Sequence, residues 1–368
     1  MKFIRESREG TDFIRLCDDE YNYSQGYYAA NNWLDDDHIL LARTNKTDFD
    51  RTRSGFDFSH AEYVLVDLKN ETETLVISDY EGHPMNTQGY IHGSELYFFV
   101  GRDLVAHDLL TGKRRTVLTD ERAHFGNTLP NEFCMTRDGR YISAQAVPAE
   151  RGPIEMWVID TETGDFEKQL LAPFAPPFWR VTHVMVCPSD RNKVFWCHEG
   201  TTEYVSNRLW LWEKDKGSRP LVRQRLSDNG NLRDCLGHEC WAADGKGLYY
   251  IKYPVAGEPP FGIGYVSTED ALDVPRILFS KYRYWHVCAS PCGKKLAADT
   301  IEGQSGVCVI DLETGEEKRF LHVGGPDRSH PTHPHPAFSP SGARLSFHDY
   351  CEVDGKPISL GIGVIDLK

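Results

Sequence analysis

The stretch SPCGKKLAADTIEGQSGVCVIDLETGE, residues 290–316, contains the pattern that decides the fold. It begins with a tight turn at Gly293, which a short β-rich strand follows. After a loop, a second strand ends in Asp-x-x-Thr-Gly at Gly315. Valine and isoleucine favour a pleated, half-buried strand, and glycine supplies the positive φ that such turns require. The stretch therefore predicts two strands of one β-sheet, each next to a tight turn.

The same pattern recurs along the chain at intervals of about 50 residues, a spacing typical of four-stranded propeller blades. The first turn of the pattern is found seven times, at Asp37, Gly93, Gly139, Asp190, Gly245, Gly293 and Gly342. No long amphipathic helix interrupts the series. We therefore expect an all-β chain that forms a seven-bladed β-propeller with four-stranded blades, as a single domain over residues 1–368.

The two ends of the chain supply parts of the same blade. The sequence IGVIDLK, residues 362–368, leaves the seventh blade one strand short, and TDFIRLCDD, residues 11–19, resembles the outer strand that is missing. We expect the N-terminal strand to close the last blade, because closure removes an exposed sheet edge that would invite aggregation.

Charge and composition exclude several classes of partner. The net charge of −14 disfavours nucleic acid, whose phosphates require a basic surface. There is no run of 18 apolar residues that would span a membrane, and residues 1–13 lack the apolar core of a secretory signal. The ten cysteines are scattered, which indicates reduced thiols. We expect a cytoplasmic protein that binds neither nucleic acid nor membrane.

Four consecutive repeats carry a histidine at one phase. Each of these histidines precedes the first-turn residue of its repeat by seven positions: His183, His238, His286 and His335. In a propeller, this phase lies just before the innermost strand, so the four rings are expected near one mouth of the central channel. A histidine that packs between blades in every repeat is the alternative interpretation, but the first three repeats have none at this phase.

Two more histidines gather beside the last of these, in RSHPTHPHPAF, residues 328–338. His333 lies two residues before His335, so in an extended strand both point to the same side, and His330 lies just ahead. Imidazoles suit zinc, manganese, iron, copper or nickel. The cluster therefore predicts a divalent metal site, which would attract an anionic ligand.

The loop of the fourth repeat, FWCHEGTTEYVSNRLWLW, residues 195–212, adds a cation on the same face. Arg208 offers a planar fork for a carboxylate, although a surface salt bridge is an equally good interpretation of its position. His198 and Glu199 begin the loop, and we expect them mainly to stabilise it.

Three segments resemble the oligogalacturonate lyases, intracellular enzymes of pectin breakdown: residues 195–212, GHECWAADGKGLYYI at 237–251, and THPHPAFSPSG at 332–342. The resemblance extends in weaker form over nearly the whole chain. It implies a seven-bladed propeller that binds manganese through three histidines and one glutamine. The matching histidines are His286, His333 and His335. The glutamine position is His330, a departure that would favour zinc, nickel or iron, or mark a different substrate.

The resemblance also implies a mechanism. The catalytic base matches His238 and the stabilising arginine matches Arg208, whereas His183 and His198 are assigned only to the substrate pocket. The implied reaction is β-elimination on a short oligogalacturonide, in which the base removes the proton on carbon 5 and a 4,5-unsaturated sugar forms. A neutral histidine, with an ordinary pKa of about 6.5, suits this role.

Other interpretations stay open beside this one. The chain could act on a different uronate, it could be a metal-dependent hydrolase or isomerase, or it could be a non-catalytic propeller that binds a sugar acid or a protein. Propellers support many functions, so the fold alone does not decide among these.

Overall fold

A computed structural model describes residues 1–26, 30–45, 61–78, 89–125, 134–146, 154–171, 181–199, 205–226, 233–254, 257–301, 306–322, 333–353 and 356–367. These residues form seven antiparallel sheets, six with four strands and one with five. The prediction of seven blades is confirmed. Within the described ranges, the one α-helix is α1 (Asp120–Ala123).

The first three four-stranded sheets follow the chain in order. They consist of β3 (Tyr21–Ser24), β4 (His38–Asn45), β5 (Glu62–Asp67) and β6 (Thr72–Ile77); β7 (Tyr90–His92), β8 (Glu95–Val100), β9 (Asp103–Asp108) and β10 (Arg114–Leu118); and β11 (Cys134–Met135), β12 (Tyr141–Ala146), β13 (Glu155–Asp160) and β14 (Phe166–Leu170).

The next three sheets continue the series. They consist of β15 (Val181–Cys187), β16 (Asp190–His198), β17 (Leu209–Glu213) and β18 (Gly217–Val222); β19 (Leu236–Trp241), β20 (Gly247–Lys252), β21 (Gly262–Ser267) and β22 (Ile277–Phe279); and β23 (Tyr284–Ala289), β24 (Lys295–Thr300), β25 (Gly306–Asp311) and β26 (Glu317–His322).

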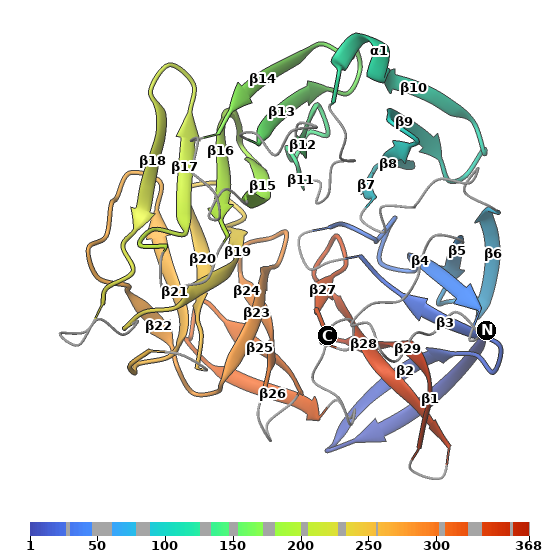
Figure 1. The fold of residues 1–368 in the computed structure, drawn as a ribbon. Coiled ribbons are helices and arrows are strands. Elements are labelled where there is room, and N and C mark those ends of the chain that lie inside the picture. The colour runs from blue at the N-terminus through green and yellow to red at the C-terminus, as the bar shows by residue number, and fades with distance from the viewer. Residues whose placement is uncertain are drawn as a thin grey trace. The chain divides into compact units, whose positions relative to one another are not determined.

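The seventh sheet joins the two ends of the described chain. Its strands, in spatial order, are β1 (Lys2–Arg8), β2 (Thr11–Cys17), β29 (Lys356–Asp366), β28 (Arg344–Val353) and β27 (Ala337–Phe338). Figure 1 shows the N-terminal strands beside the C-terminal ones, and Phe13 on β2 pairs with Ile365 on β29. Closure by an N-terminal strand is confirmed, and β1 adds a fifth strand that the sequence did not predict.

The turns form as their residues dictate. In the stretch of residues 290–316, the Ser290 hydroxyl accepts a hydrogen bond from the backbone N–H of Lys295 at 2.9 Å, and Gly293 takes a φ of 71°. In the second turn, Asp311 Oδ1 accepts from the backbone N–H of Thr314 at 2.8 Å, and Gly315 has a φ of 75°. The aspartate thus satisfies the turn's own backbone donors, which explains its recurrence.

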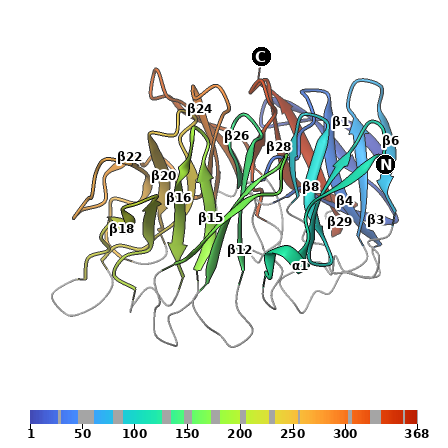
Figure 2. The ribbon, with the colours of Figure 1, turned by 90° about the horizontal axis from the view of Figure 1, so that it is seen from above.

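The described residues fall into two compact units. One comprises Met1–Gly101, Ala106–Arg114 and Cys288–Lys368, and the other Arg102–Val105 and Arg115–Val287. A core cluster of the first unit packs Leu16 and Ile362 against residues of β4 and β5. A cluster of the second packs Val158 against residues of β15 and β16, which lie side by side in Figure 2. The single domain over residues 1–368 stays a prediction.

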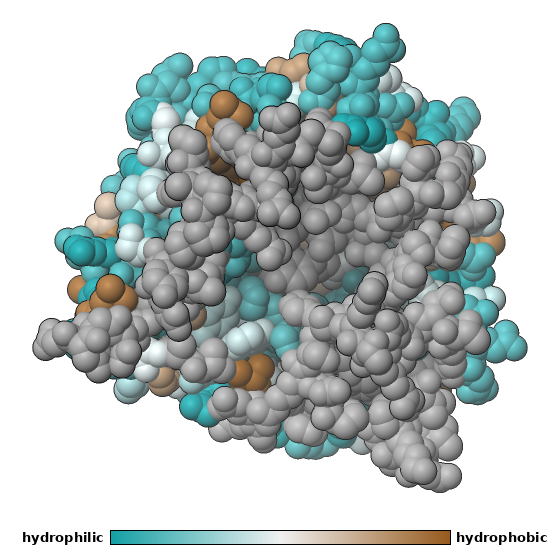
Figure 3. Space-filling model, in the orientation of Figure 1, coloured by the Kyte–Doolittle hydropathy of each residue, from teal (hydrophilic) through white to brown (hydrophobic). Residues whose placement is uncertain are grey.

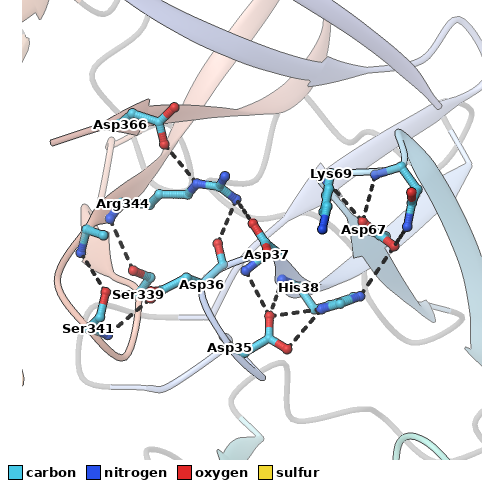
Figure 4. Close-up of polar contacts among 12 residues, drawn as sticks. Asp35, Asp36, Asp37, His38, Asp67, Lys69, Ser339, Ser341, Arg344 and Asp366 are labelled. Atoms are coloured by element: carbon cyan, nitrogen blue, oxygen red, sulfur yellow. Dashed lines mark hydrogen bonds and ion pairs between the residues drawn. The ribbon is translucent and has the colours of Figure 1, made fainter. Parts of the chain in front are cut away.

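The acidic run LDDDH, residues 34–38, serves as a structural joint. Arg344 Nη1 lies 2.9 Å from a carboxylate oxygen of Asp37, and Ser341 Oγ donates to Asp36 at 2.5 Å. The His38 ring lies between Asp35 and Asp67 (Figure 4). Every carboxylate of this run is engaged within the first unit, so the run ties the turn of the first blade to the closing sheet.

Six large hydrophobic side chains are exposed among the described residues: Leu75, Leu110, Leu170, Leu226, Val274 and Leu278. On the face drawn in Figure 3, hydrophobic residues stand apart from one another among hydrophilic ones, as is normal for scattered surface residues. No helix of the described residues is long and apolar enough to cross a membrane.

Candidate functional site

Three of the four histidines that share a phase also share an unusual backbone conformation. His183, His238 and His335 have φ angles of 53°, 47° and 43°, in the left-handed region that residues other than glycine rarely adopt. The strand pairing of β15 shifts register around His183, and that of β19 shifts around His238. Such bulges re-aim a side chain and are common next to active sites. The repeated phase therefore corresponds to a repeated bend that turns the ring.

His286 differs from these three residues. It lies within β23 without a positive φ, and its side chain is completely buried. The sequence predicted four equivalent positions. In the structure His286 differs from the other three, because it lies in an inner strand and its backbone φ is not positive.

The side chain of His238 has a defined tautomer. Its Nδ1 lies 2.5 Å from the backbone carbonyl oxygen of Trp285. A carbonyl can only accept, so Nδ1 carries the proton and donates it. A neutral imidazole then keeps its basic lone pair on Nε2. His238 is half-buried. Because the Trp285 carbonyl of the next blade takes the hydrogen bond from Nδ1, Nε2 is the nitrogen that can accept a proton.

Aromatic rings surround His238. The Tyr253 ring meets it edge-on at 5.1 Å between centroids, and the His286 ring lies tilted at 3.9 Å. The His183 ring centroid is 6.4 Å away. The phenol of Tyr253 can approach because Gly237 has no side chain: a Cβ there would lie 2.3 Å from the Tyr253 hydroxyl oxygen. Three predicted site residues, His183, His238 and His286, are thus together in one unit.

Arg208 lies directly before β17 and is only 6% exposed. Its Nη2 donates to Glu199 Oε1 at 2.5 Å and lies 3.6 Å from the Cys197 sulfur. Burial lowers the pKa of Arg208, but Cys197 and Glu199 outweigh it and leave the pKa well above its ordinary value. From the sequence, a free fork and a salt bridge were equally good interpretations of Arg208, and in the structure one edge of the guanidinium already pairs with Glu199. Its buried Nε has no hydrogen-bond partner among the described residues.

The sequence missed a carboxylate in this region. Glu239 is completely buried, and its Oε2 lies 2.9 Å from Nδ1 of His183. A charged residue inside an inner strand, directly after His238 in GHECW, was the available signal. Cys197 was also missed, and burial, followed by the charge of Glu239, raises the pKa of its thiol well above the ordinary value.

His198 ends β16 and is 6% exposed. Its backbone N–H donates to the carbonyl oxygen of Arg208 at 2.8 Å, so the pairing of β16 with β17 holds the two residues together. Any residue would make this backbone bond, so the expected stabilising role of His198 and a part for its side chain in a substrate pocket both stay predictions.

The remaining predicted histidines belong to the other unit. The rings of His333 and His335 lie edge-to-face at 5.8 Å between centroids. The backbone N–H of His335 donates to Asp299 at 3.2 Å, and its carbonyl oxygen accepts from the Gln25 side chain at 2.6 Å. His330 lies outside the described residues.

A buried histidine that the sequence did not single out supports this segment. Nδ1 of His348 lies 3.2 Å from the carbonyl oxygen of His333, and Nε2 accepts from the backbone N–H of Gln25 at 3.2 Å. The Ser24 hydroxyl contacts the same Nε2 at 3.0 Å. Both ring nitrogens are engaged, so His348 holds the backbone that presents His333 and His335.

Comparisons with known proteins agree with the motifs. No protein-family model matches the chain. It is 25% identical over 397 aligned residues to the oligogalacturonide lyase of Pectobacterium atrosepticum, which covers 96% of this chain and 93% of that protein. It is 24% identical to the oligogalacturonate lyase of Dickeya dadantii, with the same coverage.

A solved structure of an oligogalacturonate lyase is similar to this chain in fold. The structure described as oligogalacturonate lyase in complex with manganese matches 100% of this chain and 96% of its own, with a TM-score of 0.78 at 19% identity. The likeness confirms the seven-bladed β-propeller that the repeats predict. The chain is therefore similar to the oligogalacturonate lyases in sequence and in fold over nearly its whole length.

Proposed function

We propose that this protein is a metal-dependent lyase that cleaves short oligogalacturonides by β-elimination. The observation that carries the proposal is the hydrogen bond from His238 Nδ1 to the Trp285 carbonyl, because it leaves the basic lone pair of a neutral imidazole on Nε2. The names of the curated relatives, oligogalacturonide lyase and oligogalacturonate lyase, support the substrate class.

In this proposal, His238 Nε2 removes the proton from carbon 5 of the uronate. The bond between carbon 4 and the glycosidic oxygen then breaks, the electron pair of the broken C–H bond forms the double bond between carbons 4 and 5, and the oxygen leaves with its electrons. The leaving oxygen takes a proton from solvent. A side chain that titrates near neutrality is the right base for such a step.

Negative charge that develops on the substrate carboxylate has to be stabilised. Arg208 is a buried cation, and its Nε, which has no hydrogen-bond partner within the described part of the chain, is a donor that Glu199 does not occupy. A hydrogen bond to charge that develops in the transition state is stronger in such a water-poor environment than at the surface. We assign Arg208 to this role through its Nε edge.

The donor set proposed for the metal is His286, His333 and His335, with His330 as the predicted fourth ligand. The chemistry fits, because buried imidazoles suit manganese, zinc, iron or nickel, and His286 and His335 are 0% and 3% exposed. A divalent cation held by these residues would supply further positive charge for the carboxylate. Manganese is the first choice because a similar structure is a manganese complex.

The direct test is to incubate the manganese-loaded protein with di- and tri-galacturonate and to follow near-ultraviolet absorbance. Elimination produces a conjugated, absorbing sugar, whereas hydrolysis does not. We expect a steady rise that a chelator abolishes. If absorbance stayed flat with manganese, zinc, nickel and iron in turn, the proposed substrate would be wrong.

A further inference from the structure

A second cluster of metal-ligating side chains lies beside Arg208. It consists of His183 on β15, Cys197 on β16 and Glu239 on β19, one potential ligand atom from each, and these atoms all lie within 4.8 Å of one another. The three side chains come from two neighbouring sheets and are 6%, 0% and 0% exposed. Nothing in the proposed reaction uses them as a group.

We propose that His183, Cys197 and Glu239 form a second divalent-metal site, with Zn²⁺ as the preferred ion. Thiolate, imidazole and carboxylate are the three ligand types that zinc takes in proteins, and three protein ligands with one open position are common at zinc sites. The thiolate separates this site from the all-histidine set proposed above, because soft sulfur favours zinc over manganese.

The geometry needs little adjustment. Zinc–ligand bonds of about 2.0–2.3 Å place tetrahedral donor atoms about 3.5 Å apart. Since no two of the three ligand atoms are more than 4.8 Å apart, no pair has to close by much more than roughly an ångström. Glu239 is already oriented for such a contact. Its Oε2 faces His183, while its Oε1 is buried without a hydrogen-bond partner among the described residues. A buried carboxylate oxygen that is left unsatisfied is costly, and a cation would satisfy it.

The surrounding charges match a divalent ion. When the site is filled, Cys197 is a thiolate and Glu239 a carboxylate, and Glu199 adds a third negative charge next to Arg208. Three negative charges against one guanidinium leave two, which a divalent cation balances. Arg208 therefore does not repel the ion on balance. Its contact with Cys197 stabilises the thiolate, and its pairing with Glu199 holds the guanidinium beside the sulfur.

The backbone of His183 also favours a site. A φ of 53° is strained for histidine, and this bulge is what brings the ring to Glu239. The ion would link β15 and β16 to β19, one residue from the proposed base, His238. On binding, the Cys197 thiol loses its proton to solvent and the bond from sulfur to the metal forms.

Cobalt provides the test, because a thiolate bound to Co²⁺ gives a near-ultraviolet charge-transfer band that imidazole and carboxylate ligands do not give. The full-length protein is titrated with Co²⁺ as wild type, as His333→Ala, which removes a ligand of the all-histidine set, and as Cys197→Ser. We expect the band in the first two proteins and its loss in the third. Zinc added afterwards should remove the band by displacing cobalt.

Two outcomes would overturn the proposal: no band in wild type or in His333→Ala, or a band that persists in Cys197→Ser and so belongs to another cysteine. If Cys197→Ser fails to fold, as judged by circular dichroism, Glu239→Gln replaces it. This variant keeps the thiol and the side-chain shape. It should bind zinc at least roughly tenfold to a hundredfold more weakly, which is the usual loss when even an outer-shell partner of a metal ligand is removed. An unchanged zinc affinity in Glu239→Gln would also overturn the site.

Discussion

The imidazole rings of His238 and His286 lie 3.9 Å apart between centroids, tilted by 30°. They come from consecutive inner strands, β19 and β23, and only one of them makes its Nδ1 hydrogen bond to the Trp285 carbonyl. Two chemically identical side chains in contact thus have different assigned roles, base and metal ligand, and substitution can separate them.

Replacing His238 by alanine should reduce turnover of tri-galacturonate by about 10²–10⁴-fold, the usual contribution of a positioned general base. Manganese content, measured by elemental analysis, should stay near that of the wild type. A near-normal rate of absorbance increase in His238→Ala would refute the assignment of the base.

Replacing His286 by alanine should instead lower both manganese content and turnover, since the proposed ligand set loses a member. His333→Ala should behave in the same way. His92→Ala, which changes a histidine on another blade, is the matched control and should keep both properties. Full manganese content in His286→Ala and His333→Ala would contradict the proposed ligands.

Arg208→Lys keeps the charge and removes the planar guanidinium with its Nε donor. We expect kcat/KM to fall by about 10²–10³-fold, the range for losing one donor to developing charge. Arg233→Lys is the control, because the side chain of Arg233 forms an exposed ion pair with Glu258. If both variants kept wild-type kinetics, Arg208 would serve only the packing around Glu199.

The positive φ of His238 makes a prediction for stability. His238→Ala and His238→Gly lose the same ring contacts, but only glycine adopts a φ of 47° without strain. We therefore expect the glycine variant to be more stable than the alanine variant by about 1 kcal/mol in urea unfolding. The opposite order would show that no strain is stored at this position.

A buried ion cluster predicts how stability responds to acid. Asp234 contacts Lys252 at 2.6 Å and Arg225 at 2.6 Å, and its side chain is 0% exposed. Burial raises the pKa of Asp234, but hydrogen bonds from Arg225 and Lys252 outweigh it and leave the pKa below its ordinary value of 3.8. Because the folded pKa is the lower one, the stabilisation is present above pH 3.8 and is lost as the pH falls through the folded pKa.

Asp234→Asn leaves two cations facing a neutral amide at neutral pH. The free energy of unfolding should fall by roughly 3–5 kcal/mol, as when one partner of a buried ion pair is removed. The exposed Glu258→Gln should change it by less than about 1 kcal/mol. The difference between Asp234→Asn and wild type should shrink in acid, and a difference that is constant down to pH 2 would contradict the assigned pKa direction.

The fold could be predicted almost completely, because the turns of the blades require particular residues at fixed spacings. Asp311 and Gly315 satisfy local backbone groups, so their spacing is visible without any tertiary information. The strand β1 was missed because it only extends a sheet that β2 already closes. Its turn signal, Gly10 with a φ of 78° between β1 and β2, was overlooked.

The candidate site could be predicted only in part. The histidine phase located His183, His238 and His335, yet the left-handed φ that they share was invisible, since it has no sequence signature in histidine. The partners were missed for a related reason. The Trp285 carbonyl is a backbone group that every residue carries, and the contact between Glu239 and His183 joins residues 56 positions apart.

The five-stranded sheet also sets an order in time. Phe13 on β2 pairs with Ile365 on β29, and 365 − 13 is 352 positions of chain between the partners. A ribosome therefore synthesises all of the other blades before it synthesises β29, the partner of β2. Bringing such distant ends together costs about 5 kcal/mol of chain entropy when the intervening chain is unfolded, and much less once folded blades have fixed most of the path. The pairing of β2 with β29 is thus expected to form last, after the other blades have folded and brought the two strands close together.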